Sequence, residues 1–160
     1  MNNLLDLDLI FTNANASSYS DVFEKMGSTM IKKGYANDDY IEGLLSREKE
    51  FSTGVPVEPV GIAIPHTDAS YVRRNKIGIM TLENPVKFGV MGGSAEDVMD
   101  VKLVILLCFA NGNEHLKALQ NIIQMIQDVS FVEKIMNASD RNEVYKIMVE
   151  KLNHVKEEEK

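Results

Sequence analysis

Residues 101–109 read VKLVILLCF, a nearly continuous run of β-branched and aliphatic side chains. A strand that is apolar on both faces is typical of a sheet covered by helices on both sides. Upstream and downstream of this run, apolar residues recur at the three- and four-residue intervals of amphipathic helices. Buried strands that alternate with such helices predict an α/β fold built as a three-layer sandwich, with the sheet flanked by helices.

Shorter segments complete the predicted sheet, because each shows apolar alternation or a short apolar run. These strands are expected at residues 5–9, 61–64, 76–82 and 86–88. Asn84-Pro85, between the last two, reads as a tight turn that is too short for a parallel crossover. We therefore expect a mixed sheet, mostly parallel with one antiparallel pair, and a loop over residues 89–100.

Five amphipathic helices are predicted from polar residues that precede apolar residues at helical spacing. Their expected starts are Ser20, Asn37-Asp38, Asn113, Ser130 and Ser139, and the first two are expected to end near Gly34 and Arg47-Glu48. No internal repeat or low-complexity linker divides the chain. Residues 1–155 are therefore expected to form a single domain, and residues 156–160 a charged C-terminal tail.

Composition excludes several classes of function. The 160 residues carry a formal net charge of -7 that is spread over the chain, which argues against a nucleic-acid partner. The longest apolar run covers residues 103–110, whereas a membrane span needs about 20 residues, and no signal peptide is visible. Cys108, the single cysteine, lies inside that run and is expected to be an inert core residue. We expect a soluble, cytoplasmic protein with no direct membrane insertion.

Two histidines follow predicted strands at positions where ligand sites form. His66 comes directly after Pro65, which ends its strand, so His66 is expected at the carboxyl end of that strand. In open α/β sheets this edge is where ligand crevices lie. His115 follows the 101–109 strand at the start of a helix, so both imidazoles reach one edge if the two strands run the same way. Each histidine alone is also consistent with a purely structural role.

Two imidazoles beside a helix N-terminus are suited to nucleophilic chemistry. Neutral imidazole is a good nucleophile near pH 7, and the helix N-terminus attracts anions while disfavouring a protonated His115. With phosphorus as the electrophile, the product is a phosphohistidine, which needs mainly positioning and electrostatic support. Arg47 is a bidentate donor for a phosphoryl group, and the Thr53 hydroxyl lies in the loop beyond it. Arg47 is alternatively a basic residue that complements the dipole at a helix C-terminus.

Other kinds of site find little support in the sequence. His66, His115 and His154 lack the spacing of metal ligands, so no metal is expected. No phosphate-binding P-loop, dinucleotide-binding glycine motif or hydrolase nucleophile elbow occurs. We therefore expect no cofactor.

Four motifs occur together along the chain: Arg47-Glu48, Ser52-Thr53-Gly54-Val55, Gly61-Ile62-Ala63-Ile64-Pro65-His66 and His115-Leu116-Lys117-Ala118-Leu119. In combination they resemble the enzyme IIA (EIIA) domains of the sugar phosphotransferase system (PTS), fructose–mannitol class (type 2). The resemblance covers about residues 5–150, and the stretches 47–55 and 86–88 look most like the galactitol-type branch. Residue 67 is threonine where much of the class has glycine, so the loop after His66 is expected to differ in detail.

The resemblance implies a phosphotransferase component that works through a phosphohistidine. By match, His66 accepts a phosphoryl group from phospho-HPr and passes it to a cysteine of a separate IIB protein, while His115 and Arg47 support and bind that group. The membrane IIC permease would be another polypeptide, and the sugar stays open, with galactitol as one candidate. A second hypothesis is a nitrogen-type regulatory phosphoprotein, in which the phosphorylation state of His66 controls binding to other proteins.

Overall fold

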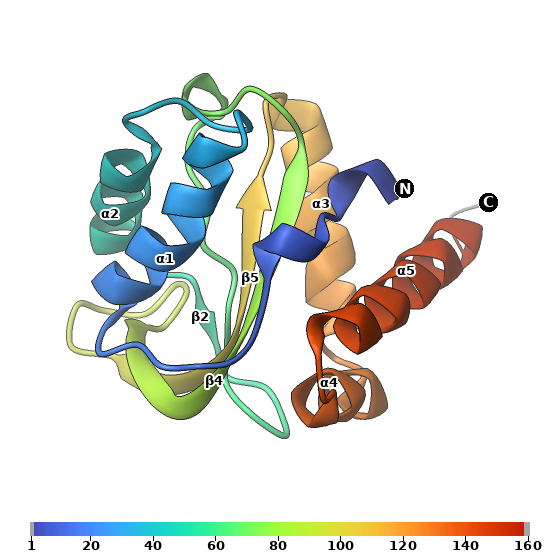
Figure 1. Ribbon diagram of the computed structural model, residues 1–160. Helices are drawn as coiled ribbons and strands as arrows, with labels where there is room; N and C mark the ends of the chain where they lie inside the picture. Colours follow the sequence, from blue (N-terminus) through green and yellow to red (C-terminus); the bar gives the residue numbers. More distant parts are fainter. Residues whose placement is uncertain (1, 159–160) are drawn as a thin grey trace.

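The computed structural model describes residues 2–158 and shows a β-sheet enclosed between two layers of helices (Figure 1). Helices α1 and α2 cover one face of the sheet, and α3, α4 and α5 cover the other. The α/β three-layer sandwich predicted from the sequence is therefore confirmed. The helices are α1 (Tyr19–Lys32), α2 (Tyr40–Glu50), α3 (Gly112–Met125), α4 (Val129–Asn137) and α5 (Arg141–Glu158).

Five strands form one mixed sheet in the order β1-β4-β5-β3-β2. Strand β1 pairs with β4 and β3 pairs with β5 in parallel, whereas β4 with β5 and β2 with β3 are antiparallel. The mixed character is confirmed, but the expected majority of parallel pairs is wrong, since two of the four pairings over residues 2–158 are antiparallel. The strands are β1 (Ile10–Ala14), β2 (Gly54–Val55), β3 (Ile62–Ala63), β4 (Lys76–Gly89) and β5 (Val98–Cys108).

The predicted turn at Asn84-Pro85 is wrong, because β4 runs through it without reversing. The pairing of β4 with β5 shifts register between Thr81 and Val86, and Pro85 lies exposed within this irregular stretch. Proline has no N–H to donate and is tolerated in a strand at such a bulge. The antiparallel partner of β4 is instead β5, which begins at Val98, inside the loop expected to end at residue 100.

Residues 5–9 do not form the predicted strand. A 3₁₀ helix covers Leu7–Leu9, and β1 begins only at Ile10. The Asp6 carboxylate accepts a hydrogen bond from the backbone N–H of Asp8, and the Asp6 carbonyl accepts one from Leu9. Local bonds from an aspartate side chain compete with the sheet ladder, which explains why alternation alone was misleading here. Two further 3₁₀ helices cover Asn2–Leu4 and Ala69–Tyr71.

Three helices begin two residues earlier than their capping residues predicted. The side chain of Ser18 caps α1, Asn111 caps α3 and Asp128 caps α4, each by accepting a backbone N–H of the first turn. A polar residue also stands at each expected position, so composition alone did not separate the alternatives. Helix α5 continues to Glu158, into the stretch expected to be a charged tail. Residues 159–160 of that tail lie outside the described residues.

Strand β5 lies in the middle of the sheet, and its side chains are buried on both faces. Alternate residues belong to the two apolar clusters, with Leu103, Ile105 and Leu107 toward α3–α5 and their neighbours toward α1 and α2. Cys108 is fully buried, and burial raises the pKa of its thiol to about 12. The thiol is therefore protonated and inert near neutral pH. Within residues 2–158, no helix combines the length and apolar character that crossing a bilayer requires.

Candidate active site

His66 lies at the carboxyl edge of the sheet, beside the end of β5. Strand β3 ends at Ala63, and the chain continues alongside β5, where Leu107 donates its N–H to the Pro65 carbonyl at 3.0 Å. His66 then forms an isolated parallel bridge with Leu107. The residue is only 9% exposed, so little of its surface faces solvent.

The imidazoles of His66 and His115 lie together, as the parallel arrangement of their strands predicts. Helix α3 starts at Gly112, four residues after β5 ends at Cys108, so its first turn lies at the same edge as His66. The two ring centroids are 4.7 Å apart, with the planes inclined by 49°. The ring of Phe109 lies edge-on to His115 at 6.2 Å and closes the apolar side of the pair.

A hydrogen bond assigns the tautomer of His66. Its Nδ1 lies 2.9 Å from the backbone carbonyl oxygen of Ile64. A carbonyl oxygen only accepts, so Nδ1 carries the proton and donates it, and Nε2 of the neutral ring keeps its lone pair. The arrangement therefore presents one nucleophilic nitrogen, with the other held protonated by the backbone.

Both imidazoles are neutral near pH 7. Burial lowers the pKa of His66, and the positive charge of Arg47 acts in the same direction, against opposing contributions from the Ile64 carbonyl and Asp68. Burial also lowers the pKa of His115 to about 4, with smaller contributions from His66 and Arg47. An unprotonated imidazole is the form that reacts as a nucleophile, so the site is kept in its reactive state.

Arg47 supplies positive charge to the same edge from the last turn of α2. Its guanidinium stacks on the ring of Phe51, 4.4 Å from the centroid, and its Nη1 lies 3.8 Å from the Asp68 carboxylate. Its Nε is buried and has no hydrogen-bond partner. A buried donor without a partner is uncommon, and here it belongs to a side chain suited to bind a bidentate anion.

Thr53 is placed differently from the expectation that its hydroxyl contacts a phosphoryl group. Its side chain donates to Glu48 Oε1 at 2.6 Å, and its backbone N–H donates to Glu48 Oε2 at 2.7 Å. Thr53 is only 1% exposed, so the hydroxyl is enclosed as well as occupied. Glu48 is the residue that sequence reasoning did not assign. Its spacing did give a signal, because it follows the buried Tyr40 and Leu44 of α2 at four-residue intervals, but its charge argued for an exposed position.

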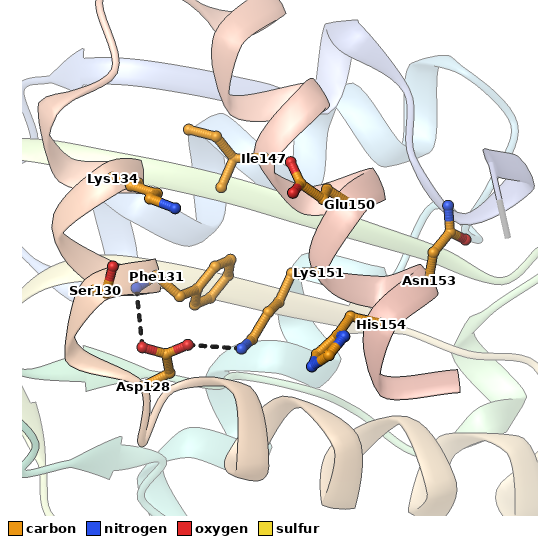
Figure 2. Close-up of a pocket in the computed structure, with 9 residues that line it drawn as sticks. All are labelled: Asp128, Ser130, Phe131, Lys134, Ile147, Glu150, Lys151, Asn153 and His154. Atoms are coloured by element: carbon orange, nitrogen blue, oxygen red, sulfur yellow. Dashed lines mark hydrogen bonds and ion pairs between the residues drawn. The ribbon is translucent and has the colours of Figure 1, made fainter. Parts of the chain in front are cut away.

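His154 belongs to a groove between α4 and α5 and does not join the other two histidines (Figure 2). Lys151 crosses this groove, 2.7 Å from the Asp128 carboxylate and 5.7 Å from the centroid of the Phe131 ring. Helix α3 separates the groove from His115, because it rises about 15 Å from His115 to its last residue, Met125, and Asp128 lies beyond that end. Within the described chain, no group of three or more His, Cys, Asp or Glu side chains is arranged to hold a metal ion.

Comparison with known proteins connects this geometry to one family. The family model described as "Phosphoenolpyruvate-dependent sugar phosphotransferase system, EIIA 2" matches residues 3–151. The galactitol-specific EIIA component of Escherichia coli K12 is 34% identical over 119 residues, which cover 73% of this chain and 77% of that protein. The mannitol-specific EIICBA component of the same strain is 26% identical over 145 residues, 90% of this chain and 22% of that longer protein.

Solved structures show the same fold. The nitrogen regulatory protein IIA-Ntr of Neisseria meningitidis aligns with a TM-score of 0.75 and 28% identity, covering 91% of this chain and 97% of that one. Mannitol enzyme IIA of E. coli, solved in complex with phosphorylated mannitol enzyme IIB, aligns with a TM-score of 0.74 and 22% identity over 91% and 99% of the two chains. Proteins of this kind are phosphotransferase components. The chain belongs to the EIIA type 2 family of the phosphoenolpyruvate-dependent sugar phosphotransferase system.

Proposed function

We propose that this chain is a phosphoryl carrier in which Nε2 of His66 accepts a phosphoryl group from phospho-HPr and passes it to a cysteine of a separate IIB protein. The observation that carries the proposal is the hydrogen bond from Nδ1 to the Ile64 carbonyl, because it leaves Nε2 unprotonated beside His115 and Arg47. We place the reaction in the cytoplasm, where the IIB protein links the chain to a membrane IIC permease.

The transfer exchanges one bond to phosphorus for another at each step. The lone pair of Nε2 attacks phosphorus, and the bond between phosphorus and the donor atom of phospho-HPr breaks with its electron pair left on the donor. In the second step a thiolate of the IIB protein attacks phosphorus, and Nε2 leaves with its lone pair restored. Throughout both steps the proton stays on Nδ1, which donates it in a hydrogen bond to the Ile64 carbonyl. Neither step requires a metal or cofactor to balance its electrons.

Charge support for the phosphoryl oxygens comes from two side chains. Arg47 presents a planar set of donors, one of them, Nε, without a partner in the described structure. His115 lies close enough to His66 for an N–H to reach an oxygen of a group carried on Nε2. Donors held at the site before the reaction stabilise the developing charge without reorganisation.

The same phosphoryl transfer can serve sugar transport or regulation, and similar proteins of both kinds are known. The 34% identity to a galactitol-specific EIIA component favours transport, with galactitol as the candidate sugar. The 28% identity and full-length overlap with a nitrogen regulatory IIA protein supports the alternative, in which phosphorylation controls binding to other proteins. Removal of the phosphate by a cognate IIB protein separates the two, because only the transport role requires it.

The test is phosphorylation with phosphoenolpyruvate, Enzyme I and HPr, read by intact-protein mass spectrometry. We expect a gain of one phosphate that is labile in acid, stable in base and absent from His66→Ala. Circular dichroism must show that this variant keeps the fold. Phosphorylation of a folded His66→Ala protein to the wild-type extent would refute the assignment. A wild-type chain that gains no phosphate from phospho-HPr would refute the proposed function itself.

A further inference from the structure

Glu48 is a buried carboxylate next to the phosphoryl site. Its residue is 4% exposed, although it lies between the half-buried Arg47 and the exposed Lys49. Burying a carboxylate is unfavourable unless hydrogen bonds replace its hydration. Both oxygens are occupied by Thr53, one by the backbone N–H at 2.7 Å and one by the hydroxyl at 2.6 Å. Burial raises the pKa of Glu48 and these two bonds oppose the rise.

A continuous series of hydrogen bonds leads from Glu48 to the reactive imidazole. The carbonyl of Thr53 accepts the N–H of Ile64 at 3.0 Å, and the carbonyl of Ile64 accepts Nδ1–H of His66 at 2.9 Å. The intervening residue, Pro65, has no N–H, so it cannot offer the series a competing donor. Ile64 is therefore held on one side by Thr53 while it holds His66 on the other.

We infer that Glu48 and Thr53 are positioning residues that set the tautomer of His66 and fix Arg47 beside it. The inference rests on the proposed function and deepens it, since neither side chain touches the phosphoryl group. Thr53 fixes the Ile64 peptide, whose carbonyl must point at Nδ1 for Nε2 to be free. Glu48 and Arg47 are consecutive in the last turn of α2, so the same carboxylate anchors the backbone that carries the guanidinium.

A purely structural role makes different predictions. If the Glu48–Thr53 bonds only stabilise the fold, their loss lowers the free energy of unfolding and leaves the His66 tautomer unchanged. If they position the site, their loss mixes the two tautomers and slows transfer. Misplacing a reacting group by about 1 Å can slow a reaction about 10²-fold. The tautomer is therefore the readout that separates the two roles.

The experiment compares the wild type with four variants by ¹⁵N-detected imidazole NMR and by transfer kinetics with phospho-HPr. Thr53→Val removes the hydroxyl, whereas Thr53→Ser keeps it. Glu48→Gln replaces the carboxylate that accepts the two hydrogen bonds from Thr53 with a weaker acceptor. Thr81→Val is the matched control, because Thr81 is also buried, at 2% exposed, and its hydroxyl bonds the N–H of Asn13 instead. All are first checked for folding by circular dichroism.

We expect Nδ1–H on His66 in the wild type, Thr53→Ser and Thr81→Val. Thr53→Val is expected to populate both tautomers and to transfer at least about tenfold more slowly at saturating donor, with little change in KM. For Glu48→Gln, the tautomer population and the transfer rate are expected to lie between those of the wild type and those of Thr53→Val. A wild-type tautomer and rate in folded Thr53→Val and Glu48→Gln would overturn the inference while leaving the phosphoryl carrier intact. Should both variants fail to fold, a wild-type His66 protonated on Nε2 would itself overturn it.

Discussion

The ion pair between Arg47 and Asp68 leads to a prediction about the phosphorylation equilibrium. In the unphosphorylated protein the Asp68 carboxylate lies 3.8 Å from Arg47 Nη1, where a phosphoryl group on His66 would seek the same donors. Asp68 therefore competes with that group for Arg47 and also repels it. Asp68→Asn removes both effects and is expected to favour the phosphorylated form.

The structure limits the size of this effect. At 3.8 Å two unit charges in bulk water attract by about 1 kcal/mol. The Asp68 side chain is 73% exposed, so solvent reduces the interaction to the range measured for surface pairs, about 0.2–1 kcal/mol. Converted at 25 °C, this predicts a rise of about 1.4- to 5-fold in the equilibrium constant for phosphoryl transfer from phospho-HPr. The rise should shrink at about 1 M salt, where charges are screened within about 3 Å.

The assay mixes each variant with phospho-HPr of known occupancy and measures both phosphoproteins at equilibrium by mass spectrometry. An equilibrium constant between free proteins does not depend on how tightly they dock, so altered binding of the donor does not affect it. Glu133→Gln, which removes an exposed carboxylate on α4 remote from the site, controls for the change in net charge. An unchanged or lowered constant for Asp68→Asn, or an equal rise in Glu133→Gln, would refute the reasoning.

Four further predictions concern charge at the site. Arg47→Ala should slow transfer about 10²-fold in stopped-flow measurements without moving the label from His66, because it removes preorganised donors and leaves the nucleophile in place; wild-type rates would exclude this role. The transfer rate should fall to half only at a pH below 6.5, since burial lowers the pKa of His66 below that value; a loss of half the rate at pH 6.5 would contradict it. The pKa of His115, held at about 4 by burial, should rise in NMR titrations once His66 is phosphorylated, because a neighbouring dianion favours the imidazolium. Because burial lowers the pKa of His115 to about 4, the free energy of unfolding should fall as pH falls from 6.5 to about 4, where His115 binds a proton in the unfolded protein but not in the folded one. His115→Ala should show a shallower fall.

Patterns that reflect burial on two faces were reliable guides to the fold. The run at residues 101–109 had no alternative to a central strand, because a helix or an edge strand would have exposed part of it. The prediction at residues 5–9 failed where a side chain intervened, since the Asp6 carboxylate takes a local N–H that a strand would have paired elsewhere. Asn84-Pro85 misled for a related reason. Asparagine and proline do favour turns, but β4 pairs with β5 both before and after these two residues, so the strand continues through them.

The candidate site was predictable to the extent that sequence order determines position. His66 follows β3, and the first turn of α3, which carries His115, follows β5, so the parallel pairing of β3 and β5 was enough to bring the two imidazoles together. Thr53 was predicted to contact the phosphoryl group because it lies close to Arg47 in the sequence. Closeness in sequence does not determine the direction in which a hydroxyl points. Glu48 follows Tyr40 and Leu44 at four-residue spacing on the buried face of α2, but its partner, Thr53, could not be predicted because only the folded chain places Thr53 beside it.

If His66 carries a phosphoryl group as we propose, the charge at this edge becomes more negative, and that change serves both candidate roles. In the unphosphorylated protein, Arg47 and Asp68 form an ion pair beside two neutral imidazoles, so these four side chains together carry no net charge. A phosphoryl group adds about −1.5 to −2 charges, draws Arg47 toward Nε2 and leaves the Asp68 carboxylate without its partner. A partner that binds this edge therefore meets two different surfaces, one nearly neutral and one with two anionic groups. A IIB protein and a regulatory target can both distinguish these two surfaces by their charge. Whether the chain serves transport or regulation therefore depends on the partner's chemistry rather than on a change in this fold.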